Sequence, residues 1–313
     1  MAKFVHKGSR KALKAIVTKT RAGRSVCVMK PEYLNLIENF RLMDDTFMSK
    51  CLENAPECIE LILRIILGKK DLKVVKSQTE YPIKSLQGRG VRFDVFARDS
   101  KDREYDIEIQ CADHGAEPKR ARYNSALIDA NALMSGEDFA RLHDTYVIFI
   151  TENDVIGRRQ GLYVFDRMDR KSGLDFGDGA HVVYANGTWR GNDALGRLMH
   201  DFNCRAVADM HFDILKKRVS QFKDSEEGRR IMCKAVEEFA ERRAAEARVE
   251  AKAEGIAEGK AEGKAEGKAE GKRETMLATA KRMLKDGILA LKDIARYSGL
   301  SLAQVKKLQA AQA

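Results

Sequence analysis

Hydrophobic and polar residues alternate most regularly in the segment 91–110, VRFDVFARDSKDREYDIEIQ. A period of two residues is typical of a strand with one buried face. The pattern predicts one strand at 91–97 and another at 105–110. The charged segment 98–103 between them predicts a tight turn, so the two strands are expected to form a hairpin.

Apolar runs and turn residues predict the other elements. The segment 145–151 (TYVIFIT) is continuously apolar, as expected for a buried central strand. Pro56 and Pro118 suit the first turn of a helix, and Gly68 and Gly136 suit helix ends. Further strands are expected at 72–83, 161–168 and 181–185, and helices at 31–40, 44–55, 57–67, 118–136, 193–202 and 206–217. The helix at 118–136 is expected to bury an apolar stripe of Tyr123, Leu127, Ala130 and Met134.

The C-terminal third has a different pattern. Ser225 is expected to cap a long helix rich in Ala, Glu and Arg, which leads into a Glu-Gly-x-Ala repeat at 254–272. Each of its five glycines costs a helix about 1 kcal/mol relative to Ala, and charges of the same sign recur at i, i+4. The repeat therefore predicts a flexible or partly helical spacer. The alternative is a rod that self-associates through its glycine stripe.

The segment 273–313 predicts a small helical tail. Ser301 and Gln304 have the spacing of a capping box. Two short helices joined by Ser-Gly-Leu-Ser resemble a helix-turn-helix that binds DNA. A simple helix pair has the same pattern, and these C-terminal helices are also the expected route to a homo-oligomer.

The hairpin carries the candidate chemistry. It can bring Asp94 beside Glu108 on its polar face, and Gln110 follows Glu108 on the same face. Two adjacent carboxylates repel each other unless a cation lies between them, and Mg²⁺ prefers such oxygen ligands. A bound divalent ion can supply a nucleophilic hydroxide and stabilise charge on a phosphate. The alternative is a solvated face with no site.

The Asp…Glu-x-Gln arrangement resembles the motif of the PD-(D/E)XK nuclease superfamily, with Gln in place of the usual Lys. Six segments in order further resemble its family of recombination-promoting nucleases and related transposases: MDDTFMSKCLEN, ELILRIILGKKDL, IKSLQGRGVRFDV, YDIEIQ, KRARYNSALIDAN and TYVIFITENDV. The resemblance implies an α/β fold, with a restriction-endonuclease-like mixed sheet flanked by helices, here followed by a helical C-terminal extension. An acid on the helix before the catalytic strands sometimes assists the metal. Glu53 and Glu57 are the candidates, and the alternative is that both lie on a solvent-exposed face.

The resemblance also implies an activity, which is Mg²⁺- or Mn²⁺-dependent cleavage of DNA with low sequence specificity, promoting recombination or transposition. Asp94 and Glu108 would hold the metal, with the carbonyl of Ile109 as a further ligand. Gln110 would orient the water or a phosphate oxygen. An amide stabilises developing negative charge less well than an ammonium group does, so Gln110 puts the rate in question.

Positive charge is concentrated at two places. The segment 1–30 holds nine Lys or Arg and no acidic residue, so removing it from the net charge of +10 leaves a nearly neutral chain. This basic arm can contact DNA phosphates, or it is a disordered extension or a transit-like segment. Lys119, Arg120 and Arg122 cluster in the first turn of a predicted helix, where the helix dipole disfavours cations. Contact with DNA explains them, as does an ordinary exposed charge cluster.

Six scattered cysteines without a C-x-x-C pair predict reduced thiols in a cytoplasmic protein. No apolar run reaches the length of a membrane span, so no membrane partner is expected. Two pairs have a spacing that zinc sites use, Cys111 with His114 and His200 with Cys204, but each pair joins different elements.

Four parts of the chain are therefore expected. They are a basic arm at 1–30, a nuclease domain at 31–224, a long helix with the repeat as linker at 225–272, and a helical tail at 273–313. Two other functions remain open: a DNA-binding accessory protein with a decayed site, and an interaction protein that oligomerises through its C-terminal helices.

Overall fold

A computed structural model describes residues 31–84, 88–111 and 115–311. The chain divides into two compact units, one ending at Phe239 and the other covering Ala240–Ala313. The basic arm at 1–30 lies outside the described residues.

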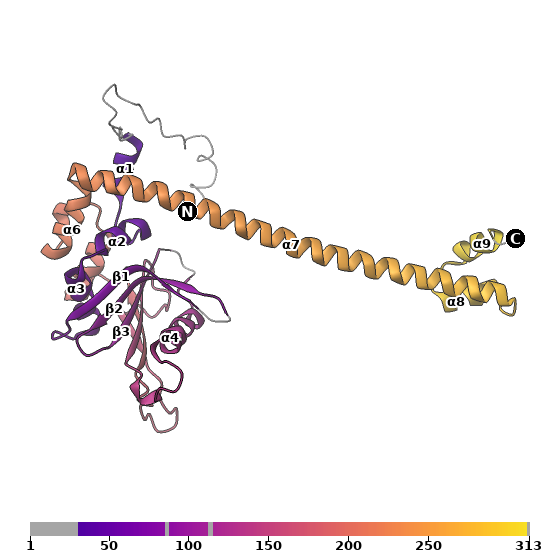
Figure 1. The fold of residues 1–313 in the computed structure, drawn as a ribbon, viewed down its shortest axis with the longest axis horizontal. Coiled ribbons are helices and arrows are strands. Elements are labelled where there is room, and N and C mark those ends of the chain that lie inside the picture. Colours follow the sequence, from indigo (N-terminus) through magenta and orange to yellow (C-terminus); the bar gives the residue numbers. More distant parts are fainter. Residues whose placement is uncertain (1–30, 85–87, 112–114, 312–313) are drawn as a thin grey trace. The chain divides into compact units, whose positions relative to one another are not determined.

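The first unit contains a six-stranded mixed sheet, of which Figure 1 labels β1, β2 and β3. The strand order is β1-β2-β3-β4-β6-β5. Its strands are β1 (Val74–Ile83), β2 (Val91–Asp99), β3 (Glu104–Gln110), β4 (Thr145–Thr151), β5 (Leu162–Phe165) and β6 (Ala180–Asn186). Parallel pairing joins β3 to β4 and β4 to β6, and the remaining pairs are antiparallel. The mixed sheet and its flanking helices are the predicted restriction-endonuclease-like α/β fold.

The helices follow the predicted order. They are α1 (Pro31–Asn39), α2 (Asp45–Leu52), α3 (Pro56–Leu67), α4 (Pro118–Ala132), α5 (Ala194–Asn203), α6 (Asp213–Lys223), α7 (Glu226–Asp286), α8 (Leu291–Ser298) and α9 (Leu302–Ala310), with short 3-10 helices at Phe139–Arg141 and Val207–Asp209. The predicted helix at 206–217 is wrong in its bounds, because the 3-10 turn is separate and α6 starts only at Asp213. The predicted strand at 161–168 is shorter, because only an isolated bridge from Met168 to Asp175 continues it.

Several terminal residues act as predicted. Pro occupies the first turn of α3 and α4, and Gly68 ends α3 in the left-handed region with a φ of 65°. The Ser225 hydroxyl accepts the amide of Gly228 at 2.9 Å, at the start of α7. The complete capping box of Ser301 and Gln304 starts α9.

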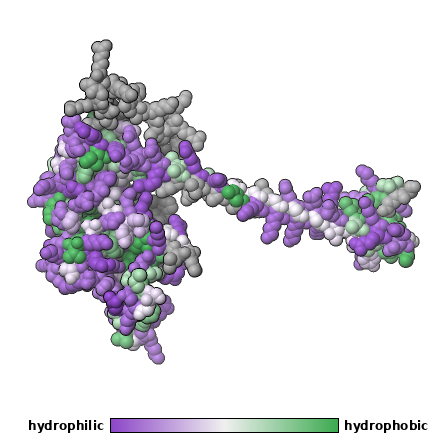
Figure 2. Space-filling model, viewed as in Figure 1, coloured by the Kyte–Doolittle hydropathy of each residue, from purple (hydrophilic) through white to green (hydrophobic). Residues whose placement is uncertain are grey.

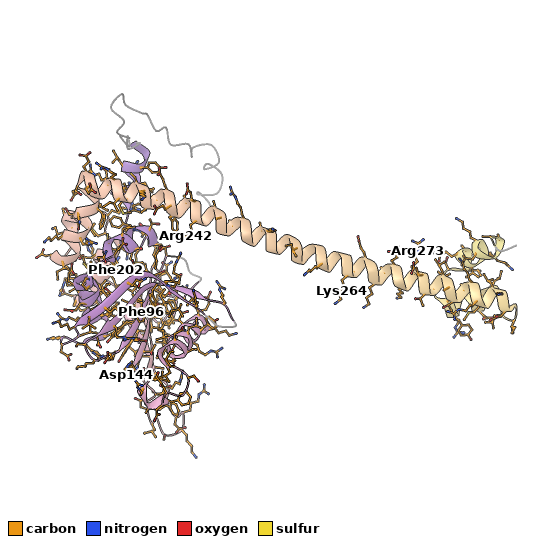
Figure 3. The ribbon with its side chains drawn as sticks, in the orientation of Figure 1. Phe96, Asp144, Phe202, Arg242, Lys264 and Arg273 are labelled. Atoms are coloured by element: carbon orange, nitrogen blue, oxygen red, sulfur yellow. The ribbon has the colours of Figure 1, made fainter. Side chains whose placement is uncertain are left out.

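The two faces of the sheet have different partners. On one face, α2, α3, α5 and α6 enclose the largest apolar cluster, which includes Ile107, Ile109 and Ile150 of the central strands. The opposite face meets α4 through smaller apolar clusters, one around Phe149 and another around Phe96, which Figure 3 labels. As predicted, β4 is buried along its whole length. Residues of β3 that alternate with the isoleucines therefore point toward α4.

Of the apolar stripe predicted for α4, only Leu127 is buried. Met134 lies beyond the helix, which ends at Ala132, and its side chain is 77% exposed. Tyr123 is also exposed, whereas Asn124 is fully buried. The reason is the face that α4 covers: part of it is polar, so α4 buries a polar residue there.

The Glu-Gly-x-Ala repeat is helical throughout, as part of the 61-residue helix α7, so a flexible spacer is not what the structure shows. Helix continues on both sides of the repeat. The repeat therefore only extends an existing helix and does not have to initiate one, which is the unfavourable step of helix formation. Its other residues, Ala, Glu and Lys, are strong helix formers. A Cβ added at Gly263 would meet no atom within 4 Å, and the Lys264 and Arg273 side chains project from the helix (Figure 3).

The end of the second unit has its own small core. Ala280 of α7, Ile294 of α8, and Leu300 and Val305 at α9 pack together. The exposed surface of the C-terminal part of α7 is mostly hydrophilic (Figure 2). Among the described residues, no helix combines the length and hydrophobicity needed to cross a membrane.

Candidate active site

The acidic residues of the predicted hairpin lie between the sheet and α4. Strand β3 pairs with β2 through Val95 opposite Ile107 and Phe96 opposite Asp106. Continuing this register places Asp94 opposite Glu108. Phe96 packs against α4, and residues two apart share a face of a strand. Asp94, Asp106 and Glu108 therefore face α4 together.

The β2–β3 ladder opens at this point. The Asp94 carboxylate accepts the amide of Ile109 at 2.8 Å and so replaces a ladder hydrogen bond. The carbonyl of Gln110 accepts the amide of Glu152 on the side of β4. Because successive residues of a strand alternate in direction, the carbonyl of Ile109 faces Asp94. In this orientation, the carbonyl oxygen of Ile109 could act as the predicted metal ligand.

Asp106 is a third carboxylate in the cluster. It is fully buried, and its Oδ2 accepts the side-chain amide of Asn124 at 2.8 Å. Its Oδ1 has no hydrogen-bond partner, and neither does Oδ1 of Asn124. A buried oxygen without a partner costs about 1–3 kcal/mol. The sequence places Asp106 on the polar face but does not distinguish it from a solvated acid.

Arg120 is the cation of this site. Its guanidinium donates to Oε2 of the fully buried Glu108 and to the carbonyl of Gly115 at 2.7 Å. It also lies over the ring of Phe149, with the guanidinium carbon 5.8 Å from the ring centroid. Arg120, predicted as an exposed DNA contact, thus belongs to the acidic cluster. Lys119 and Arg122 remain exposed on α4.

The carboxyl groups have raised pKa values. Burial raises the pKa of Asp94 and of Asp106 well above the ordinary value, and the charge of Glu108 raises both further. Burial also raises the pKa of Glu108, while Arg120 acts in the opposite direction. Among the described residues, a single guanidinium contacts this cluster and does not neutralise three carboxylates, so the cluster favours either bound protons or a further cation.

A fourth acid acts on this cluster from α2. The charge of Asp45, the first residue of that helix, raises the pKa of both Asp94 and Glu108. The predicted helix acids lie elsewhere: Glu53 pairs with Lys50 at 2.9 Å, and Glu57 is exposed. Of the three acids, Asp45 is therefore the one whose charge acts on this cluster.

Gln110 completes the group. Its side-chain nitrogen lies 3.5 Å from Oε2 of Glu108, so the two side chains share a face as predicted. A Cβ added to Gly115 would lie 2.5 Å from Oε1 of Gln110. Gly115 also has a φ of 104°, which few other residues adopt. This close approach holds the amide of Gln110 against the loop that precedes α4.

The donor set fits a divalent ion. Asp94 and Glu108, the orphaned Oδ1 of Asp106 and the carbonyl of Ile109 are all hard oxygen donors. Raised carboxyl pKa values are the expected property of such a site when no metal compensates the charge. The guanidinium of Arg120 donates to the Glu108 carboxylate. A bound metal would therefore share that carboxylate with Arg120.

Two residue pairs have a spacing that zinc sites use, and the structure describes only one of them fully. His114 lies outside the described residues. The Cys204 thiol donates to the carbonyl of Ala206 at 3.0 Å, and His200 groups with other residues.

Comparison with known proteins gives the family of this domain. The family model of the PD-(D/E)XK nuclease family transposases matches residues 52–186, which include all six strands. No significant match was found among curated proteins or among solved structures. Nucleases of this superfamily usually use divalent metals, and the match indicates a nuclease- or transposase-like function. Residues 52–186, which form the sheet domain, thus match the PD-(D/E)XK nuclease family transposases.

Proposed function

We propose that this protein is a metal-dependent DNA endonuclease that hydrolyses phosphodiester bonds. The observation that carries the proposal is the convergence of Asp94, Asp106 and Glu108, with raised pKa values and one guanidinium, in a domain of a nuclease family. Mg²⁺ or Mn²⁺ is the proposed ion because every donor is an oxygen.

Each residue has a distinct proposed role. Asp94 and Glu108 would hold the ion, the carbonyl of Ile109 would add a ligand, and the negative charge of Asp106 would help to stabilise the ion. When bound, the ion supplies an activated water and stabilises negative charge on the phosphate. Gln110 donates its amide hydrogen to the water or to a phosphate oxygen.

Arg120 is proposed to take part of the role that Lys has in the usual motif. Its guanidinium reaches Oε2 of Glu108, the acid that precedes Gln110 by two residues. A permanent positive charge there stabilises negative charge that develops on a phosphate. A neutral Gln110 is then compatible with catalysis, because the charge comes from α4.

DNA is the proposed substrate. Lys119 and Arg122 are exposed on the helix that carries Arg120 and are suited to contact backbone phosphates. Phosphate contacts carry no sequence information, so low sequence specificity is expected. Such cleavage would promote recombination or transposition in a reduced, cytoplasmic setting.

A second candidate is an accessory protein that binds DNA or oligomerises without cutting. Two observations favour it: the motif position of Lys holds Gln110, and Arg120 already neutralises part of Glu108. The C-terminal helices α8 and α9, with their exposed Lys306 and Lys307, would then supply binding or self-association.

A supercoiled-plasmid assay distinguishes these functions. The endonuclease predicts nicking with Mg²⁺ or Mn²⁺ that EDTA abolishes. DNA binding without nicking supports the accessory protein and contradicts the endonuclease. Neither binding nor nicking, with a large oligomer by light scattering, supports an interaction protein.

A further inference from the structure

Two histidines and an aspartate gather where α5 ends, and none of them belongs to the acidic cluster of Asp94, Asp106 and Glu108. They are His200 and Asp201 in the last turn of α5, and His211 in the segment before α6. One ligand atom from each lies within 4.8 Å of the other two. Asp201 is fully buried, His200 is partly buried and His211 is exposed. The group therefore opens to solvent on one side.

Backbone hydrogen bonds fix the carboxylate. Oδ1 of Asp201 accepts the amide of His211 at 2.8 Å, and Oδ2 accepts the amide of Phe212 at 2.9 Å. These bonds hold the start of α6 against the last turn of α5. They also bring the two imidazoles together, with ring centroids 4.7 Å apart and planes at 56°.

The ring nitrogens of the two histidines make few hydrogen bonds within the described protein. Nδ1 of His200 lies 3.3 Å from Oδ1 of Asp201, a long contact. In the described part of the chain, no hydrogen bond is found for the ring of His211 or for the second nitrogen of His200. A fixed carboxylate beside two imidazoles with free nitrogens is the arrangement that a metal ligand set requires.

We propose that His200, Asp201 and His211 bind a divalent first-row transition-metal ion of the Zn²⁺ type. Imidazole and carboxylate together suit such ions, whereas Mg²⁺ prefers oxygen ligands alone. Zn²⁺ takes nitrogen ligands at about 2.0–2.1 Å, so the three ligand atoms, which lie within 4.8 Å of one another, would approach further when the ion binds. Water completes the coordination on the open side.

The charge balance favours a cation. With neutral imidazoles, the group carries the single negative charge of Asp201. The partial negative charge at the C-terminal end of α5 adds to it. An ion bound here would join α5 to the segment before α6, so binding would raise the stability of the first unit.

Titration of the full-length, tag-free protein with Zn²⁺, and with Co²⁺ as a spectroscopic probe, tests this site. The background carries Asp94→Asn and Glu108→Gln, which remove the two carboxylates proposed to hold an ion at the acidic cluster. We expect His200→Ala and His211→Ala each to weaken binding by more than roughly 10-fold. His143→Ala, which alters an exposed histidine in another loop, is the matched control and should bind as the background does.

Two readouts make the result decisive. Zn²⁺ should raise the thermal unfolding temperature of the background protein, and this rise should disappear in His211→Ala, whose exposed side chain is not needed for folding. Excess Mg²⁺ should not compete with Zn²⁺. Absence of Zn²⁺ binding, or equal binding by both histidine variants and the control, would overturn the proposal.

Discussion

Gln110 is the residue at which this chain departs from the usual nuclease motif. Its amide lies 3.5 Å from Glu108 and is held by the close approach of Gly115. We predict that Gln110→Ala lowers the nicking rate roughly 10- to 1000-fold, because the variant has no positioned donor. Gln110→Lys should keep partial activity. Isothermal titration should show that Gln110→Ala still binds Mn²⁺, and a wild-type nicking rate would exclude a catalytic role for Gln110.

The raised carboxyl pKa values predict how stability depends on pH. Above about pH 4 the unfolded chain has released protons that Asp94, Asp106 and Glu108 still hold in the folded protein. The free energy of unfolding in EDTA should therefore fall as pH rises from that range through the raised pKa values.

Asp106→Asn removes one of these groups and weakens the repulsion among the others. Urea unfolding across this pH range should show a smaller decline for Asp106→Asn than for the wild type. Saturating Mn²⁺ should oppose the decline in the wild type, since the ion binds the deprotonated carboxylates. Parallel curves for the two proteins would contradict the assigned pKa shifts.

At the level of residues, local spacing predicted part of the site. The two-residue period places Asp94, Glu108 and Gln110 on one face, and the structure brings them together. The partners of these residues come from other elements. Arg120 and Asn124 approach from α4, and their inward direction depends on how that helix packs. The roles of Arg120 and Asn124 were therefore not evident from the sequence.

At the level of elements, the helix α7 remains continuous through the glycines of the Glu-Gly-x-Ala repeat. A Cβ at Gly263 would meet no neighbouring atom, so Gly263→Ala should stabilise the helix by about 1 kcal/mol. Far-ultraviolet circular dichroism during thermal unfolding of the full chain should show the helical signal persisting to higher temperature.

Gly299→Ala is the matched comparison. Gly299 has a φ of 76°, and a Cβ there would lie 2.9 Å from the Met276 side chain. This substitution should destabilise the tail by roughly 1–2 kcal/mol. If Gly263→Ala lowers helical stability instead, the repeat is not the solvated helix described here.

The same physics explains which elements the sequence predicted. Period-two alternation and the apolar run at 145–151 identified the strands, because both patterns lie within the strand's own residues. The alternation did not predict that the polar face of β3 is buried as well. The pattern failed for α4, whose buried face packs partly against the polar cluster and partly against small apolar clusters. The sequence pattern also failed for the Glu-Gly-x-Ala repeat. The prediction counted the cost of each glycine in an isolated helix and did not include the stabilisation from the helix on either side.

At the level of the whole molecule, charge is unevenly distributed. The segment 1–30 carries nine basic residues, almost the entire net charge of +10. Deleting it should weaken DNA binding and reduce the slope of log affinity against log salt by roughly 0.9 for each phosphate that the segment neutralises. Fluorescence anisotropy with duplex DNA at several salt concentrations measures this slope. An unchanged slope would show that the segment does not bind DNA.

The central claim is that the carboxylates of Asp94 and Glu108 are required for DNA cleavage. Its most direct test is plasmid nicking in Mn²⁺ by the wild type, Asp94→Asn, Glu108→Gln and the control Glu53→Gln, which alters an acid paired with Lys50 instead. Circular dichroism should show that all four are folded, since the amides preserve the size of each side chain. We predict nicking by the wild type and the control, and none by Asp94→Asn or Glu108→Gln. Nicking by Asp94→Asn at the wild-type rate, after exclusion of a contaminating nuclease, would contradict the assignment.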